Sequence, residues 1–134
     1  MKIRLQDSFV VPFERSFDAA YGLEYVSPTT ARITVRDQLL GADGTVSSGV
    51  YAAIAESLAS TGTAVEVVPA GLIPSGLSNS THVLRDVRDG VLEATARCRA
   101  RGEREWLWDV EIGLAGGDPS AIATVAIAVR AKRV

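Results

Sequence analysis

The sequence predicts an α+β fold in which a curved antiparallel sheet wraps around one long central helix. Residues 47–60 are mostly small or apolar and carry a single charge, which indicates a helix buried on nearly every side. Predicted strands stand on both sides of this stretch, about four of them after it, and three of these four have alternating polarity. The links between the last runs are short, which favours antiparallel pairing with one buried face.

The part before the helix predicts one short helix and two strands. Residues 16–21 favour a short helix, for which Ser16 is a candidate N-cap. Residues 23–26 indicate a strand, and Pro28 marks the turn that follows it. Across residues 31–36, apolar and polar side chains alternate, so this second strand is expected to have one face in water.

The central helix has clear signals at both ends. A loop at residues 41–44 precedes Ser47 and Ser48, and either serine is a natural N-cap. Gly62 is expected to end the helix, because glycine is a poor helix former. An extended segment is then expected to begin over residues 65–68.

The last third of the chain has the strongest pattern. Three alternating runs cover residues 92–101, 106–114 and 123–129, and turns at Gly102 and residues 116–119 separate them. The apolar face of the first run includes Cys98 and Ala100, which leaves Arg101 on the wet face. The apolar face of the second run begins with Trp106 and Trp108, which are expected to pack in the core or an interface.

Glu56 is the most informative single residue. It is the only charged residue from Gly44 to Val65, and no Lys or Arg occurs between Arg36 and Arg85. A carboxylate buried in an apolar helix is costly unless it is paired, hydrogen-bonded or kept for chemistry. We therefore expect Glu56 to be buried and to act as a general base. The alternative is a solvent-exposed residue on a partly buried helix.

Length and composition limit the classes of function. The 134 residues fit one domain, 1–134, and the net charge of -2 argues against a nucleic-acid partner. Cys98 is the only cysteine, so no intrachain disulfide forms, and one His with one Cys cannot make a usual zinc site. We therefore expect no metal. No segment has the pattern of a signal peptide or of a bilayer span, so we expect a cytoplasmic protein with no membrane partner.

Basic residues gather late in the chain. Of the 14 Lys and Arg residues, nine lie at or after Arg85. They form either a local anion site on an acidic protein or an ordinary set of solvated strand faces, and the pattern does not choose between the two.

One helix enclosed by a curved sheet is the arrangement of the hotdog fold, and four stretches resemble one family with that fold. They are residues 21–26, 44–49, 76–82 and 85–90. The chain resembles the hotdog-fold acyl-CoA thioesterases of the phenylacetate-degradation, enterobactin-proofreading and 4-hydroxybenzoyl-CoA type. The resemblance extends over roughly residues 21–129.

The resemblance implies a catalytic set on the central helix. Glu56 stands where the family has its general base or nucleophile, and Ser60 stands where the family holds the attacking water. The backbone N–H of Ser48, next to Gly49, stands where the family binds the thioester oxygen. Ser48 and Glu56 are eight residues apart, about 12 Å along a helix, so the resemblance implies a site shared across a dimer interface.

The sequence departs from the family at two positions. Ser47 stands where the family usually has His, and Gly41 stands where it has Gln or Asn. Each lost side chain removes a support for the thioester carbonyl that is worth a few kcal/mol, about 3 in comparable sites. The Ser47 hydroxyl, or Asp43 in the same loop, is a candidate substitute.

Further residues are candidates for contact with the substrate that the resemblance implies. The acyl group is expected to contact Tyr51, Asn79, Thr81 and His82. Coenzyme A is expected to contact Arg85, Arg88, Arg101 and Arg104, because guanidinium groups suit phosphates and stack on bases. The alternatives are a hydrogen-bonded structural His82 and four ordinary surface arginines.

The function implied is hydrolysis of acyl-CoA thioesters by a homodimer or tetramer. Coenzyme A enters only as part of the substrate, so no separate cofactor is expected. A non-catalytic module that binds acyl-CoA or another acyl ligand is the alternative, favoured by Ser47 and Gly41 in place of the family residues. A hotdog hydratase is a third class, but the helix segment lacks the His and Asp of that class.

Overall fold

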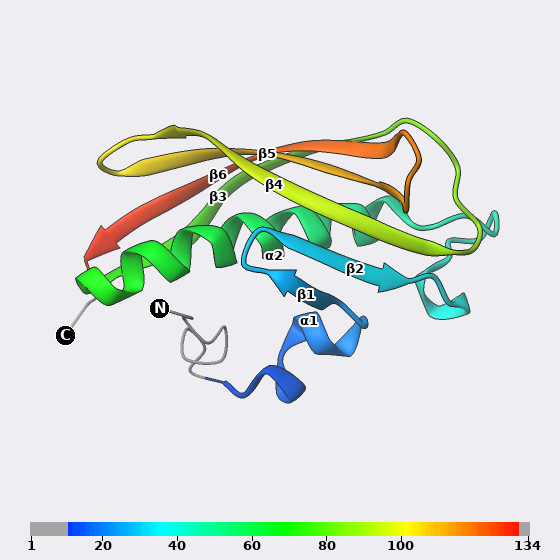
Figure 1. Ribbon diagram of the computed structural model, residues 1–134, viewed down its shortest axis with the longest axis horizontal. Coiled ribbons are helices and arrows are strands. Elements are labelled where there is room, and N and C mark those ends of the chain that lie inside the picture. Colours follow the sequence, from blue (N-terminus) through cyan, green and yellow to red (C-terminus); the bar gives the residue numbers. More distant parts are fainter. Residues whose placement is uncertain (1–10, 132–134) are drawn as a thin grey trace.

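A curved sheet and one long helix make up most of the structure (Figure 1). The computed structural model describes residues 11–131. Six strands form one antiparallel sheet in the order β1-β2-β4-β5-β6-β3, and helix α2 (Ser48–Val67) packs across one face. The strands are β1 (Glu24–Ser27), β2 (Thr30–Thr34), β3 (Leu72–Val83), β4 (Val91–Arg101), β5 (Glu105–Leu114) and β6 (Pro119–Ala131).

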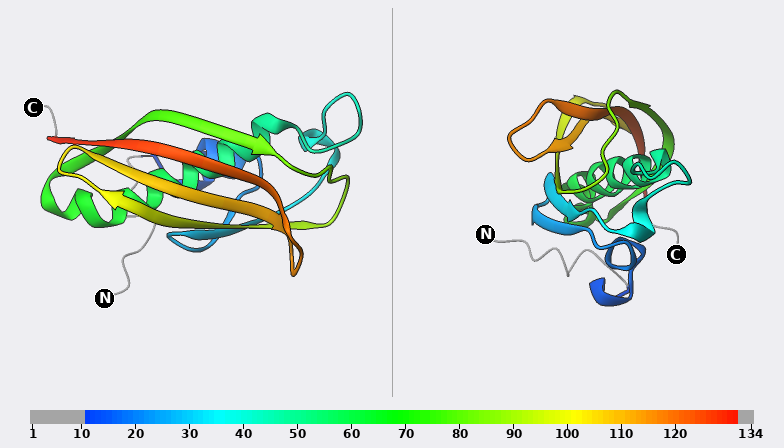
Figure 2. Two further views of the ribbon diagram at one scale, coloured as in Figure 1. Left: turned by 90° about the horizontal axis from the view of Figure 1, so that it is seen from above. Right: turned by 90° about the vertical axis from the view of Figure 1, so that its right-hand side faces the viewer.

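Seen end-on, the sheet bends around α2 (Figure 2). The core lies between them, where Tyr51, Ile54 and Leu58 of the helix are almost fully buried. The facing side chains of the sheet come mainly from its central strands and include Leu92, Trp106, Trp108, Val110, Ile112, Val125 and Ile127. The predicted α+β class, with a curved antiparallel sheet around one central helix, is confirmed.

A short N-terminal segment packs against the flank of α2 away from the sheet centre. A 3₁₀ turn (Phe13–Arg15) leads into helix α1 (Phe17–Ala20), which Ser16 caps by accepting a hydrogen bond from the Ala19 N–H. The predicted short helix and its cap are therefore confirmed. None of the helices within residues 11–131 is long and apolar enough to cross a membrane.

Helix α2 begins where the sequence predicts and ends later. Ser47 is the N-cap, one of the two serines expected. The predicted end at Gly62 and the predicted extended segment at 65–68 are wrong, because the helix continues to Val67 and passes into a 3₁₀ turn (Val68–Ala70). Gly71, with φ of 81°, then reverses the chain into β3.

Packing against β5 explains why the helix passes through Gly62. A Cβ built on Gly62 would lie 2.6 Å from the Cη2 atom of Trp108, so the indole occupies the space that a side chain would need. The Nε1–H of Trp108 donates to the Oγ1 of Thr63 at 2.9 Å, and this hydroxyl donates to the Ala59 carbonyl at 2.8 Å. These tertiary contacts override the low helix propensity of glycine.

Replacing Gly62 with Ala is therefore expected to destabilise the protein. Helix propensity alone would favour Ala by about 1 kcal/mol, whereas overpacking a core costs about 1–3 kcal/mol. We expect a net loss in the free energy of unfolding, measured by urea denaturation. Gly41→Ala is the control, since its Cβ would meet other atoms only at 3.7 Å and should change stability little. A more stable Gly62→Ala variant would contradict the packing described.

The alternation of side chains between the two faces of the sheet reverses partway along β4. The pairing of β4 with β5 shifts between Cys98 and Ala100, so Arg99 is an extra residue in a β-bulge. Beyond the bulge Arg101 pairs with Trp106. The prediction that Ala100 shares the buried face is wrong, because the inserted residue reverses the alternation. Arg101 is exposed as predicted, although its pairing with Trp106 places it on the helix side of the sheet. Cys98 keeps its predicted place against the core.

Candidate active site

The start of α2 has a free backbone donor. The side-chain oxygen of Ser47 accepts a hydrogen bond from the Gly49 N–H at 3.3 Å. Ser48 is exposed, and within residues 11–131 its own N–H makes no hydrogen bond. The first amides of a helix carry the positive end of its dipole. The Ser48 N–H can therefore stabilise a developing oxyanion.

The loop before the helix is held by its own hydrogen bonds. One carboxylate oxygen of Asp43 accepts from the Thr45 N–H at 3.0 Å and from the Thr45 hydroxyl at 2.8 Å. These two hydrogen bonds lower the pKa of Asp43 below its usual range, and the bond from the Thr45 N–H has the larger effect. The Gly41 N–H donates to the Thr45 carbonyl, which closes the turn. Asp43 thus stabilises its own loop and does not contact the free amide of Ser48 in this structure.

Glu56 lies on the side of α2 that the sheet leaves open. It is exposed within residues 11–131, so the expected burial of Glu56 is not found, and the alternative of a solvent-exposed residue on a partly buried helix is what the structure shows. The sheet covers one side of the helix, whereas Glu56 shares an open stripe with Gly49, Ala53 and Ser60, which are exposed or half-buried. Ser60 follows Glu56 by one turn on this stripe, as the i to i+4 spacing predicts.

The Glu56 carboxylate rests against edge strand β3. The position that a Cβ would take on Gly76 is occupied by its Oε1 atom. Glu56 makes no ion pair or side-chain hydrogen bond with any residue from 11 to 131. A carboxylate that is exposed, without a partner and seated at a sheet edge is available to take a proton from a substrate or a water molecule.

The three predicted substrate residues on strand β3 lie on two different faces of the sheet. Asn79 and Thr81 pair with Val125 and Ala123, which face the helix, whereas His82 pairs with Ile122, which is exposed on the outer face. Asn79 donates to a helix carbonyl and accepts from Thr81, so both lie near Glu56. His82 lies on the opposite face of the sheet and does not join this group within one chain.

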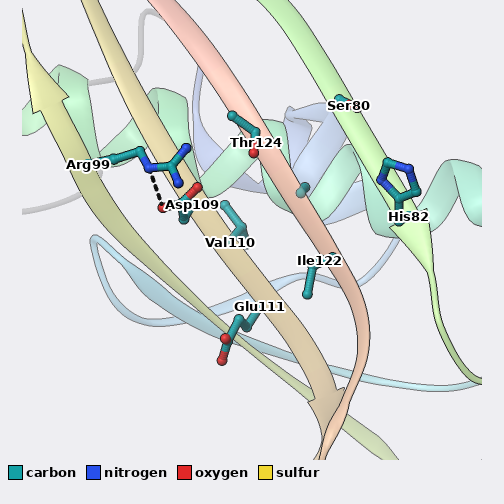
Figure 3. A pocket seen from close by; sticks show the side chains of 9 residues that line it. Ser80, His82, Arg99, Asp109, Val110, Glu111, Ile122 and Thr124 are labelled. Atoms are coloured by element: carbon teal, nitrogen blue, oxygen red, sulfur yellow. Dashed lines mark ion pairs between the residues drawn. The ribbon is translucent and has the colours of Figure 1, made fainter.

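Figure 3 shows the outer face around His82. A shallow hollow of ≈ 390 Å³ is lined there by side chains of four strands. Arg99 and Asp109 form an exposed ion pair at 3.3 Å on the side of the hollow away from His82, and Thr124 lies between this pair and Ser80. The sheet separates this hollow from Glu56 and the start of α2, so it is not part of the candidate active site.

Tyr51 belongs to the interior. Its side chain is fully buried between α2 and the sheet, and its hydroxyl has no hydrogen-bond partner among the described residues. Burial, with a smaller contribution from the negative charge of Asp86, raises the pKa of Tyr51. The contact of Tyr51 with an acyl group stays a prediction.

The four predicted coenzyme A arginines divide into two groups. Arg85 and Arg88 lie in the segment before β4. The Val46 N–H donates a hydrogen bond to the Val87 carbonyl, which holds this segment close to the start of α2. Arg88 donates to the Asp43 carbonyl at 3.2 Å. Arg85 forms an exposed ion pair with Asp118 at 3.3 Å.

The other two arginines lie at the far end of β4, about 30 Å away for a strand of 11 residues. Arg101 pairs with Glu66 at 2.9 Å and lies over the Trp106 ring, 4.6 Å from its centroid. Arg104 lines a separate open hollow of ≈ 580 Å³ together with Arg130. The two groups therefore lie toward opposite ends of β4 on the same chain.

Sequence reasoning missed a polar cluster between the N-terminal segment and α2. Asp18 accepts from the Ser57 hydroxyl at 2.6 Å and from the Tyr25 hydroxyl at 2.9 Å. Tyr25 also lies 2.9 Å from the Thr61 hydroxyl, and Tyr21 lies 3.2 Å from that of Ser57. The cluster joins α1 and β1 to the helix turn that follows Glu56. Only Tyr21 and Tyr25, in a stretch already matched to the family, gave any signal of it.

The cluster predicts a loss of stability at high pH. Burial raises the pKa of Tyr21 and of Tyr25 far above the usual value of about 10, and Asp18 adds to both effects. Above about pH 10 the unfolded chain loses these protons while the folded chain keeps them, so unfolding becomes more favourable as pH rises.

Urea denaturation at several pH values from about 8 to about 11 should therefore show falling stability in the upper half of this range. The double variant Tyr21→Phe/Tyr25→Phe should be less stable at pH 8 but show a shallower decline. A decline of the same slope in the variant would contradict the assignment.

Comparison with known proteins supports one family. No family model matches the chain. The protein named "Putative esterase Rv1847" of Mycobacterium tuberculosis is 36% identical over 102 residues, which cover 72% of this chain and 73% of that protein. Its solved structure matches this one with a TM-score of 0.82 at 31% identity, over 88% of this chain and 98% of that chain.

Two solved thioesterases have the same fold. A glutamine-to-alanine mutant of thioesterase PA1618 from Pseudomonas aeruginosa matches with a TM-score of 0.81 and 27% identity, over 87% of each chain. Thioesterase HI1161 from Haemophilus influenzae matches with a TM-score of 0.75 over 86% of this chain and 82% of that chain; at 22% identity it supports the fold alone. The similarity to PA1618 and to the mycobacterial esterase supports a hydrolase that acts on thioesters, and the chain belongs to the family of hotdog-fold thioesterases.

Proposed function

We propose that this protein hydrolyses acyl-CoA thioesters to a free acid and coenzyme A, with Glu56 as the catalytic carboxylate. The observation that carries the proposal is the exposed Glu56 carboxylate, seated at the edge of β3 without an ion-pair partner among the described residues. The free N–H of Ser48 at the helix start supplies the matching donor for the thioester oxygen.

The proposed site needs two copies of the chain. Eight residues of helix place Glu56 about 12 Å from Ser48, which is too far for both to act on one carbonyl carbon. The open stripe of α2 and the edge strand β3 lie side by side, and exposed edges favour pairing with a second chain. We propose a homodimer, or a tetramer built from it, in which Glu56 of one copy acts with Ser48 of the other.

The reaction then proceeds with few groups. Glu56 removes a proton from water as the water oxygen attacks the thioester carbon, and the Ser48 N–H binds the oxyanion that forms. Collapse of this intermediate breaks the C–S bond and releases the thiolate of coenzyme A. Alternatively, Glu56 attacks directly and water opens the resulting anhydride. Ser60 is proposed to orient the water. A thiolate is a good leaving group, so a strong general acid is not required.

Coenzyme A is proposed to bind near the start of α2. Arg85 and Arg88 lie at this end of the molecule, whereas Arg101 is held by Glu66 and Trp106 at the other. Of the four arginines, Arg85 and Arg88 are therefore the stronger candidates within the chain that supplies the oxyanion donor. The partner chain is a second route by which Arg101 or Arg104 reaches the same ligand.

A panel of coenzyme A esters tests the proposal. The purified protein is mixed with aromatic and fatty acyl esters, and free thiol is measured over time. Thiol release that scales with protein concentration is the expected result. An absence of thiol release across both classes of ester would overturn the proposal.

The second candidate is a protein that binds acyl-CoA without cleaving it. Ser47 and Gly41 favour it, because neither supplies the carbonyl support that the family residues provide. The same panel separates the two functions when binding is measured by calorimetry beside thiol release. A binder takes up the ester and leaves it intact, whereas the thioesterase returns free coenzyme A.

A further inference from the structure

A glycine in the middle of β3 provides the space for the Glu56 carboxylate. A Cβ on Gly76 would overlap the Oε1 atom of Glu56 and would lie 3.4 Å from its Cδ atom. Gly76 is not among the glycines with positive φ, so its backbone does not require glycine. A glycine inside a strand often marks a close approach of another group. Here that group is the side chain of Glu56.

The register of β3 changes next to this glycine. Gly76 pairs with Ile127 and Ser78 pairs with Ala126, so Leu77 is an extra residue in a bulge. A bulge redirects the side chains that follow it. The result is that Gly76 faces the helix before the bulge and Asn79 faces it after the bulge.

Asn79 ties the strand to the helical turn that carries Glu56. Its Nδ2–H donates to the Ala52 carbonyl at 2.9 Å. Ala52 precedes Glu56 by four residues, so this carbonyl is also the helical acceptor for the Glu56 N–H. The Thr81 hydroxyl donates to the Asn79 Oδ1 at 2.7 Å, which fixes the orientation of the amide. Both side chains thus have partners within the chain.

We propose that Gly76, Asn79 and Thr81 are positioning residues that hold the Glu56 carboxylate against β3. Gly76 leaves the space that the carboxylate occupies, and the Asn79–Thr81 pair fixes the distance between the strand and the turn. This assigns Asn79 and Thr81 to the alignment of Glu56 in place of contact with substrate. The inference rests on the proposed function, because it concerns how that carboxylate is aimed.

Gly76→Ala tests the space directly. The added methyl group displaces the carboxylate without removing its charge, and a displacement of about 1 Å can cost a factor of about 100 in rate. We expect kcat for acyl-CoA hydrolysis to fall roughly 10- to 100-fold with little change in KM. In a Glu56→Asp background the shorter side chain no longer reaches Gly76, so the same substitution should have little further effect on kcat.

Asn79→Ala tests the link to the helix, with Ser80→Ala as its control on the outer face of the same strand. We expect Asn79→Ala to lower kcat by about tenfold at nearly constant KM, and Ser80→Ala to leave both unchanged. Adding Thr81→Val to Asn79→Ala should have little further effect, because the two side chains act through one contact. If Gly76→Ala does not fold, the comparison of Asn79→Ala with Ser80→Ala tests the positioning role instead.

Two results would overturn the inference: kcat at the wild-type level in Gly76→Ala and Asn79→Ala, or a loss from Gly76→Ala of equal size in the Glu56 and Glu56→Asp backgrounds. Failure of the proposed function is distinguishable, since it would appear as an absence of thiol release in the wild-type protein or as full activity in Glu56→Gln. A Glu56→Gln variant without activity together with unaffected Gly76 and Asn79 variants would reject the positioning role alone.

Discussion

Replacing Glu56 with Gln is expected to lower kcat/KM for acyl-CoA hydrolysis by a factor of about 10²–10⁴, the range typical for loss of a general base. The amide is nearly the same size as the carboxylate but cannot accept a proton from water. Because Glu56 is exposed and makes no ion pair within the described residues, its replacement should leave the fold intact. Steady-state thiol release and a thermal unfolding curve together measure both expectations.

Glu66 provides a matched control on the same helix. It is also exposed, but its carboxylate pairs with Arg101 at 2.9 Å near the far end of α2. An exposed pair of this kind contributes about 0–1 kcal/mol to stability. Glu66→Gln should therefore keep wild-type turnover with at most a small loss of stability. Equal turnover in wild type and Glu56→Gln would remove Glu56 from the mechanism.

Ser48→Pro is expected to lower kcat by a factor of about 10²–10³, the cost of losing one oxyanion donor. Proline removes the backbone N–H and nothing else that the helix needs, because Ser48 is the first residue of α2 and proline is favoured there. Ser47, with φ of -62° and ψ of 139°, already has the extended backbone that a following proline requires.

Ser48→Ala separates the amide from the hydroxyl. It keeps the N–H and removes only the side-chain oxygen, so it should retain nearly full activity. Steady-state kinetics on both variants, with circular dichroism to confirm the helix, measure the difference. Similar activity of Ser48→Pro and Ser48→Ala would contradict the role of the backbone donor.

The architecture could be predicted because its signals are local. Alternation of polar and apolar residues over 92–101, 106–114 and 123–129 gave three strands in the correct places. The apolar stretch from Ser47 onward gave the helix, and it limited the N-cap to Ser47 or Ser48, of which Ser47 is the one found. Each of these features depends on neighbours within one turn or one strand, which the sequence shows directly.

The errors arose where distant residues decide the outcome. The helix continues through Gly62 because Trp108, 46 positions later, packs where a side chain would be. Ala100 does not share the buried face because one inserted residue, Arg99, reverses the phase of β4. Neither the helix propensity of single residues nor the alternation of polar and apolar residues reveals either effect.

The candidate site was predicted in part for the same reason. The spacing of Ser48, Glu56 and Ser60 along one helix follows from the sequence and is found in the structure. The exposure of Glu56 depends on how far the sheet curves, and its contact with Gly76 depends on a bulge in β3. A glycine inside a run of strand residues was the one sequence signal for that contact.

A mixed oligomer tests most directly whether Glu56 of one chain and the Ser48 amide of another act on the same thioester. The Glu56→Gln and Ser48→Pro variants, carrying different affinity tags, are produced together, and assemblies that contain both are purified. Each interface between the two variants then retains one complete site of two, so roughly half of the wild-type activity per dimer should return. Mixed assemblies no more active than either parent variant would contradict a site shared between chains.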